Sequence, residues 1–212
     1  MSAALKIDHY TYQEYLDLER KDPEGKRFEF FQGIIKAMAG GTRNHNLIIQ
    51  NLSFLFRKGL KGKDCFTFTE SLKLELIPNE FYVYPDVLIT CDPLDKKDQV
   101  IQRYPSIIVE VISKSTEKEV RGRKMQAYMA LPSLKHYILV SQYEPVVEIF
   151  SRNQARWWYQ IFTTIEQTLT IPDTQIHLPL SDVFDEVTFI PEVPSPSEGE
   201  ESKDTTRGNT EP

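Results

Sequence analysis

Two apolar stretches decide the fold of this chain: FYVYPDVLI at residues 81–89 and SIIVEVIS at residues 106–113. Near-continuous hydrophobic runs of this length are typical of central strands that are buried on both faces of a sheet. Each run holds one carboxylate, Asp86 in the first and Glu110 in the second. Burying a carboxylate in such a strand is costly unless it is paired or metal-bound. The two acids therefore predict a divalent-cation site; the alternative is that each pairs with an arginine or lies at a strand end.

The flanking sequence alternates between helical and strand patterns. Thr11 is a suitable N-cap for a short helix over residues 11–19, and residues 27–38 predict two strands around a tight Gln32-Gly33 turn. Apolar residues at helical spacing predict an amphipathic helix over 43–60, and a second helix is expected over 116–131, opened by Ser115 or Thr116 and closed before Pro132. Further strands are expected at 64–77 (two short strands), 82–91, 106–113, 135–141, 145–151, 156–161 and 168–171, with a final turn at 180–184.

These elements predict an α/β (α+β) fold, with a mixed central sheet flanked by helices and preceded by a helix and a hairpin. We expect one domain over residues 1–190. Residues 191–212 are rich in Pro, Ser and Glu and hold no aromatic residue, so we expect a disordered acidic tail there.

Charge and composition restrict the kinds of function that this chain could have. The net charge of −6 argues at first against nucleic acid, but residues 191–212 contribute six acids and two bases, which leaves only −2 for residues 1–190. The sequence contains no run of eighteen apolar residues, so we expect no membrane span. The first residues lack the pattern of a secretory signal. A cytoplasmic protein is expected, in which Cys65 and Cys91 would be reduced core residues. Basic residues cluster at 57–63 and 114–124, and for the first cluster we favour a solvated helix face.

A hydrolytic site built on Mg²⁺ or Mn²⁺ also needs a group that organises the attacking water. Nucleases with the PD-(D/E)xK signature carry a lysine two residues after the glutamate, where this chain has Ile112. The helix that follows places Arg121, Lys124 and Tyr128 on one face. Lys124 could reach the water or the phosphate, and Arg121 and Tyr128 could contact the phosphate or orient its neighbours. The alternative is an amphipathic helix with a basic outer stripe, which we prefer for Arg123.

Three further groups are candidates for the same site. The backbone carbonyl of Val111 leaves the strand beside Glu110 and could be a further metal ligand. Glu29 interrupts an aromatic run in the hairpin, and could reach the metal or face solvent. His45 lies on the apolar face of its helix, where a histidine is more often a core residue than a catalyst.

The chain resembles the Uma-two family of restriction-endonuclease-like proteins, within the PD-(D/E)xK superfamily. The resemblance covers about residues 8–185 and rests on HYTYQEYLDL, RFEFFQGII, NHNLIIQNL, YPDVLI, SIIVEVISKST, RGRKMQAYMALPSLKHYILVSQ and VEIFSRN. It implies a nuclease-like sheet, a metal site at Asp86 and Glu110, and transfer of the lysine role to Lys124. Glu29 falls on the acid of the family's early hairpin. This chain departs from the family at Val120, where relatives usually carry aspartate, and at Arg123, where they often carry an acid.

The expected function is thus a Mg²⁺- or Mn²⁺-dependent endonuclease that hydrolyses DNA. Two alternatives stay open: a non-catalytic nuclease-fold module that binds DNA or a partner protein, and a hydrolase of another phosphate ester. A homodimer is expected, because the strands around Trp157 and Trp158 offer more apolar surface than one side of a sheet buries. Adjacent strand residues face opposite sides, so one tryptophan should face the core and the other a helix, a partner or solvent.

Overall fold

The computed structural model describes residues 9–38 and 40–189. Its main layer is a six-stranded mixed sheet in the order β11-β10-β9-β8-β6-β3, in which only the β8–β9 pair is parallel. A second sheet has the order β2-β1-β5-β4-β7, and β12 pairs with β13. The helices are α1 (Tyr12–Lys21), α2 (Arg43–Gly59), α3 (Glu117–Val120), α4 (Arg123–Ala130) and α5 (Leu180–Val183). The strands are β1 (Phe28–Phe31), β2 (Ile34–Ala37), β3 (Phe66–Thr69), β4 (Lys73–Ile77), β5 (Phe81–Val83), β6 (Val87–Thr90), β7 (Ile101–Gln102), β8 (Pro105–Ile112), β9 (His136–Ser141), β10 (Val147–Asn153), β11 (Arg156–Phe162), β12 (Thr168–Thr170) and β13 (His177–Pro179).

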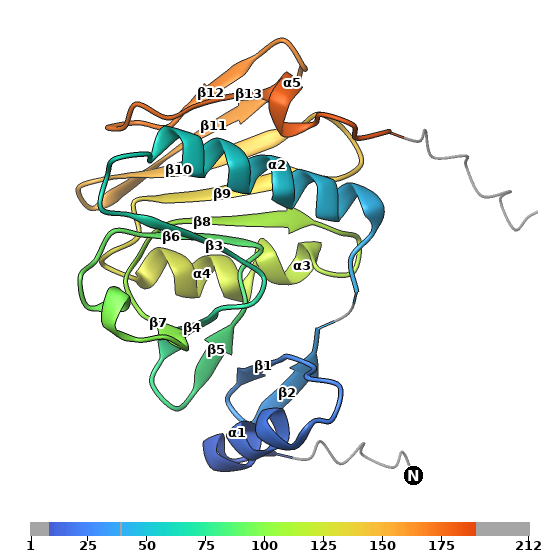
Figure 1. Cartoon of the computed structure of the whole chain (residues 1–212), viewed down its shortest axis with the longest axis vertical. Coiled ribbons are helices and arrows are strands. Elements are labelled where there is room, and N and C mark those ends of the chain that lie inside the picture. Colours follow the sequence, from blue (N-terminus) through green and yellow to red (C-terminus); the bar gives the residue numbers. More distant parts are fainter. Residues whose placement is uncertain (1–8, 39, 190–212) are drawn as a thin grey trace, which may run out of the picture.

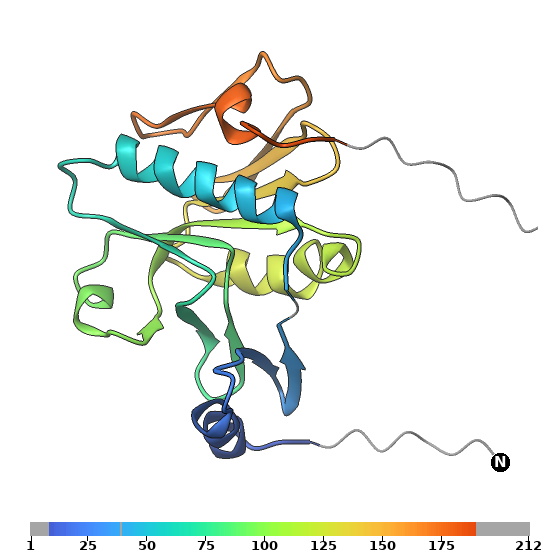
Figure 2. The same cartoon turned by 45° about the vertical axis from the view of Figure 1, so that its right-hand side comes forward.

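Helices cover both faces of the six-stranded sheet, as expected of a mixed α+β fold. Helix α2 lies across one face and α4 across the other, so that the sheet is the middle layer of three (Figures 1 and 2). Alternate residues of the central strands point to opposite layers: Val109 and Val111 pack with α2, whereas Ile108 and Ile112 pack with α4. Ile112, which occupies the lysine slot of the nuclease signature, is therefore a core residue.

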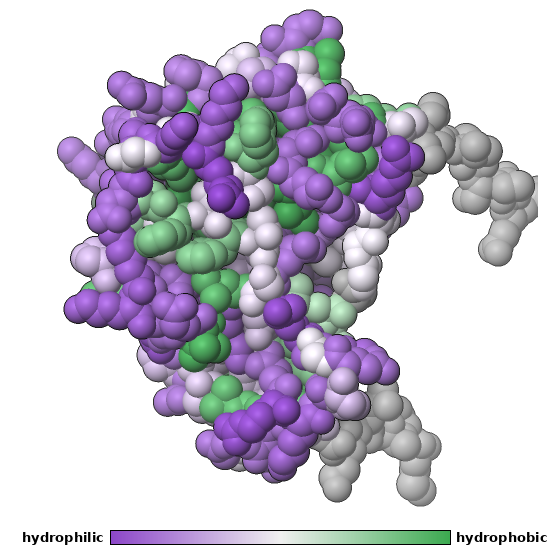
Figure 3. Space-filling model, viewed as in Figure 1, coloured by the Kyte–Doolittle hydropathy of each residue, from purple (hydrophilic) through white to green (hydrophobic). Residues whose placement is uncertain are grey.

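Local sequence accounts for the first elements. Thr11 caps α1 in a capping box with Glu14, and Thr42 caps α2. The β1–β2 hairpin turns through Gln32 and Gly33, both with positive φ. The hairpin and α1 stand at one end of the molecule, and the outline is indented between them and the N-terminal end of α2 (Figures 1 and 3).

The run at 82–91 does not form the single strand predicted from its hydrophobicity. The chain leaves the second sheet after β5, passes through Tyr84-Pro85-Asp86, and enters the main sheet as β6. Pro85 has no N–H to donate to a ladder, which breaks the strand at this point. The break joins the two sheets and leaves Asp86 at the start of β6.

The helix predicted over 116–131 is also divided, into α3 and α4. Its break lies at Arg121 and Gly122, and a Cβ added to Gly122 would approach the carbonyl oxygen of Lys118 to 2.7 Å. Glycine permits this close backbone approach. The break re-aims α4, so that its first turn lies over the end of β8.

The prediction of reduced core cysteines was wrong, because the structure pairs Cys65 with Cys91 in a disulfide. The cysteines flank the antiparallel pair Phe66–Thr90 of β3 and β6, which brings their Cα atoms to 4.1 Å. The sequence pattern placed both residues in strands but not opposite each other.

The expected tail at 191–212 lies outside the described residues, and so do residues 1–8. Among the described helices, none combines the length and the apolar character that crossing a membrane requires.

Candidate active site

The two strand carboxylates lie together at the end of β6 and β8. The antiparallel register of Val87 with Val109 places Asp86, just before β6, next to the Glu110–Val111 segment. Both acids are buried, at 8% and 4% exposure, yet they line a cavity of about 460 Å³. The cavity lies where the hairpin, α2 and the α3–α4 segment meet.

Asp86 is fixed by the backbone of the neighbouring strand. Its Oδ2 atom accepts a hydrogen bond of 2.6 Å from the Val111 N–H. Along a strand the N–H and C=O of one residue point to the same side, and the next residue points to the other. Gln142 binds the Ile112 carbonyl from the β9 side, which is consistent with this alternation. The Val111 carbonyl therefore faces Asp86, where Pro85 offers no N–H to pair with it.

Lys124 reaches the same place from the first turn of α4. Its Nζ lies 2.6 Å from Oε1 of Glu29 and 3.3 Å from Oε1 of Glu110. Glu29 comes from β1, so the hairpin supplies a carboxylate to the main-sheet site. These side chains are buried together.

Tyr128 lies one helical turn after Lys124 and is fully buried. Its hydroxyl donates a 2.6 Å hydrogen bond to Oε1 of Glu110. Burial, followed by the charge of Glu110, raises the pKa of Tyr128 well above its usual value. Tyr128 therefore stays protonated and holds the Glu110 carboxylate in place.

Burial and neighbouring charges act in opposite directions on the pKa values of this cluster. Burial raises the pKa of Glu110 to about 7, although the positive charge of Lys124 acts in the other direction. Burial alone would lower the pKa of Lys124, but the carboxylates of Glu110 and Glu29 outweigh it and raise the pKa. When all are ionised, three carboxylates (Asp86, Glu110 and Glu29) face one ammonium, which leaves two negative charges uncompensated within this group.

His45 and Glu70 extend the site on the α2 side of Asp86. Ligand atoms of these three side chains lie within 4.8 Å of one another, a spacing that suits a metal ion. The His45 Nε2 is 3.4 Å from Oδ2 of Asp86. Burial lowers the pKa of His45, but the hydrogen bond and charge of Asp86 prevail and raise it.

Glu70 was not predicted from the sequence, because it lies in the turn between β3 and β4 and not in a patterned element. Its backbone φ of 45° and the hydrogen bond from its N–H to the Asp86 carbonyl set its position. Only the fold brings this turn beside Asp86.

The structure turns Arg121 away from this cavity. Its guanidinium binds the Glu148 carboxylate and Glu117, and Arg121 does not line the cavity. Arg123 pairs with Glu119 and stacks over the ring of Phe31 at 4.2 Å. Val120, at the position where the family resemblance leads us to expect aspartate, is the last residue of α3, and its side chain is buried in the core.

Residues 12–181 match the model of the Uma2 family, described as "Putative restriction endonuclease". The chain belongs to this family. The match spans α1 to the start of α5 and so includes every residue of the candidate site.

Two proteins of Synechocystis sp. strain PCC 6803 are similar in sequence to this chain, and both are described as uncharacterized. Identity is 39% over 146 residues with slr1290, covering 69% of this chain and 76% of that protein. Identity is 31% over 150 residues with sll1609, covering 70% of this chain and 84% of that protein.

A crystal structure from Anabaena variabilis, described as a "putative nuclease belonging to DUF820", has a similar fold. The TM-score is 0.68 at 16% identity, over 84% of this chain and 99% of the other. This likeness shows that the Uma2 chain shares the mixed α+β fold of that protein.

Proposed function

We propose that this protein is a Mg²⁺- or Mn²⁺-dependent endonuclease that hydrolyses phosphodiester bonds of DNA. The observation that carries the proposal is the cluster in which Lys124 meets Glu110 and Glu29 beside Asp86. A buried group of acids around one lysine is costly for stability, so its presence in a cavity favours a functional role.

The donor set fits a hard divalent cation. Asp86, Glu110 and the Val111 carbonyl supply oxygen atoms, which Mg²⁺ and Mn²⁺ prefer, and the two uncompensated negative charges match the charge of the ion. His45 and Glu70 are further donors on the other side of Asp86. When bound, the cation supplies Lewis-acid stabilisation of the charge that builds up on the phosphate.

The side chains around the donors have separate tasks in this proposal. Lys124 takes the role of the signature lysine: its ammonium donates hydrogen bonds to the attacking water or to a phosphate oxygen. Glu29 holds that ammonium in position, and Tyr128 holds the Glu110 carboxylate. Neither Tyr128 nor Arg121 is placed for direct contact with a phosphate, because the first is buried and the second is bound to acids.

A non-catalytic module that binds DNA is the second candidate. Two observations favour it. The Arg121 guanidinium is bound to Glu148, and Val120 is apolar, so neither side chain offers a polar group to a substrate. Calorimetric titration with Mn²⁺ separates the two readings, because only the nuclease requires the ion at Asp86 and Glu110. Hydrolysis of a different phosphate ester is separated by the choice of substrate.

The proposal is tested by nicking of supercoiled plasmid DNA in Mn²⁺. The wild-type chain should convert the plasmid to open-circular and linear forms, EDTA should stop the reaction, and Glu110→Ala should abolish it. Lys118→Ala, an exposed lysine on α3, serves as a control and should cleave like the wild type. Equal trace activity of wild type and Glu110→Ala would show that the cleavage does not come from this site.

We further propose a homodimer formed through β11. This strand is the edge of the main sheet, and Trp158, Tyr159 and Ile161 are each about half exposed or more. It has no charged side chain between Trp157 and Phe162, whereas solitary edge strands usually carry charges that prevent pairing. Antiparallel pairing of β11 with a second copy would satisfy its edge and cover these side chains.

A further inference from the structure

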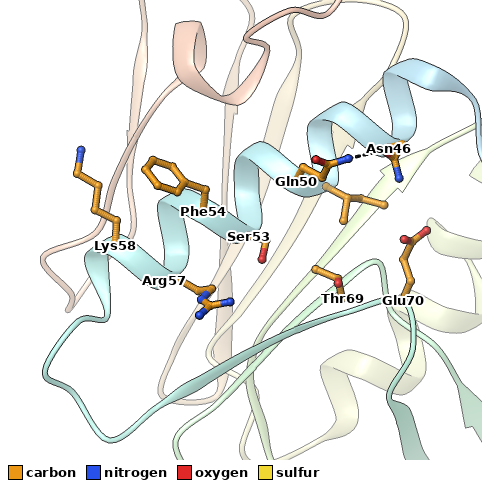
Figure 4. A pocket seen from close by; sticks show the side chains of 9 residues that line it. Asn46, Gln50, Ser53, Phe54, Arg57, Lys58, Thr69 and Glu70 are labelled. Atoms are coloured by element: carbon orange, nitrogen blue, oxygen red, sulfur yellow. Dashed lines mark hydrogen bonds between the residues drawn. The ribbon is translucent and has the colours of Figure 1, made fainter.

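A second groove runs along the exposed edge of α2. Its volume is about 700 Å³, and it lies between the helix and the end of β3 (Figure 4). The side chains of Ser53 and Arg57 leave the helix on the edge that faces Thr69 and Glu70, and the Gln50 amide donates a hydrogen bond to the side-chain oxygen of Asn46 along the helix. The proposed nuclease chemistry does not use this groove.

The groove presents hydrogen-bond donors in a regular row. Asn46, Gln50, Ser53 and Arg57 follow one another at spacings of four, three and four residues, which places them in one stripe of the helix. Amide, hydroxyl and guanidinium groups are the donors that proteins use to bind phosphate and sugar oxygens of nucleic acids. The stripe therefore suits a polyanionic backbone.

Positive charge is concentrated at one end of the groove. Arg57 and Lys58 lie at its far end, are exposed, and take part in no ion pair with another described residue. Arg121 and Arg123, in contrast, are both bound to carboxylates. Positive charges without acidic neighbours are the ones that phosphates can neutralise, with release of counterions.

The near end of the groove adjoins the candidate active site. Glu70 lines both cavities and belongs to the cluster with His45 and Asp86. From His45 to Arg57 the helix rises roughly 18 Å, at 1.5 Å per residue. This length corresponds to about five nucleotides at the 3.4 Å axial rise of a stacked, B-form strand, and to fewer in an extended single strand.

An exposed aromatic ring accompanies the basic end. Phe54 is 64% exposed, lines the groove, and projects from the helix on the same side as Lys58, whereas Ser53 and Arg57 point to the other side (Figure 4). Exposed aromatic side chains beside a basic groove provide stacking platforms for unpaired bases.

We propose that this groove binds a single DNA strand that leaves the scissile phosphate and runs along α2, with its backbone at Arg57 and Lys58 and a base against Phe54. The identity of the polyanion as DNA rests on the proposed nuclease function. The groove thereby determines on which side of the cut the enzyme holds its substrate.

The test measures binding separately from cleavage. In a Glu110→Gln background, which should not cleave, fluorescence anisotropy of a labelled single-stranded DNA oligonucleotide is recorded over a range of salt concentrations. Arg57→Gln/Lys58→Gln should weaken binding about tenfold and reduce the slope of log K against log salt by about 1.4, the value for two lost phosphate contacts. Phe54→Ala should weaken binding at least about fivefold.

The matched control is Lys97→Gln/Lys135→Gln, which removes two positive charges from exposed positions outside both cavities and outside β11. It should leave affinity and slope close to those of the parent. Equal effects of the two double variants, or a parent chain that does not bind the oligonucleotide, would overturn the proposal. A groove-dependent slope in a protein that never cleaves DNA would support the groove and reject the nuclease.

Discussion

Lys124 provides the positive charge beside two buried carboxylates of the candidate site. It places a positive charge between Glu29 and Glu110 where all three are almost fully buried. Removing one partner from such a group leaves charges that are neither solvated nor paired. Lys124 therefore links the stability of the domain to the chemistry of the site.

We predict that Lys124→Met lowers the free energy of unfolding by about 3–5 kcal/mol, because two buried carboxylates lose their counter-charge. Urea denaturation at neutral pH measures the effect, and Lys118→Met on the exposed face of α3 is the control, expected within about 0.5 kcal/mol of wild type. Adding Glu29→Gln to Lys124→Met should recover part of the loss. No recovery would mean that the loss comes from packing and not from charge.

His136 gives a pH dependence outside the site. It is buried beside Ser151, and burial lowers the pKa of its imidazole to about 4 from the ordinary 6.5. The unfolded chain therefore takes up a proton near pH 6.5, whereas the folded chain does so only near pH 4. The stabilisation is complete above pH 6.5 and is lost as the pH falls towards 4.

Relative to His136→Gln, the wild-type free energy of unfolding should fall by about 3 kcal/mol between pH 7 and pH 4. Denaturation curves of both proteins at several pH values give this difference. Parallel pH profiles would show that His136 does not titrate between the two states as described.

At the scale of elements, two interruptions assemble the site. Pro85 ends β5 and sends the chain into the main sheet, which sets Asp86 beside Val111. Gly122 ends α3 and starts α4 in a new direction, which brings Lys124 over Glu110. Continuous elements at either place would carry these side chains elsewhere.

Gly122→Ala should therefore be destabilising, although alanine usually stabilises a helical segment. The added methyl group meets the Lys118 carbonyl oxygen at 2.7 Å, and we expect a loss of about 1–3 kcal/mol in the free energy of unfolding. The control is Gly40→Ala, where a Cβ meets nothing within 4 Å. If the two variants unfold alike, the break at Gly122 is not constrained by this contact.

These interruptions also mark where prediction from sequence succeeds and fails. Hydrophobic periodicity located β8, α2 and the hairpin to within a few residues, since burial imposes that pattern directly. It did not predict the breaks at Pro85 and Gly122, because a run of apolar residues does not record which sheet or helix each half joins. The disulfide and the position of Glu70 were not predicted for the same reason, because tertiary register determines which residues lie beside them.

The site shows the same division. Asp86 and Glu110 stand out in sequence because a carboxylate in a buried strand is costly. Arg121 shares a helical face with Lys124 only if the helix is continuous, and the break at Gly122 separates the two. Lys124 faces the cavity, and Arg121 faces Glu148.

At the scale of the whole molecule, the exposed edge strand predicts self-association. Light scattering coupled to size-exclusion chromatography should give about twice the chain mass of 24.7 kDa. Trp158→Lys/Ile161→Lys should shift the protein to the monomer by placing charges at the edge of β11. A monomeric wild type, or a dimer that persists with both lysines, would contradict the proposed dimer interface at β11.

The proposed nuclease activity depends on a divalent cation at the junction of the two sheets. The most direct measurement is the anomalous scattering of Mn²⁺ in crystals of the protein soaked with the metal. We predict a strong peak ligated by the carboxylates of Asp86 and Glu110 and by the Val111 carbonyl, with Lys124 within a few ångströms, and its loss in Glu110→Gln. A map without a peak at Asp86 and Glu110, or with Mn²⁺ bound only elsewhere, would contradict it.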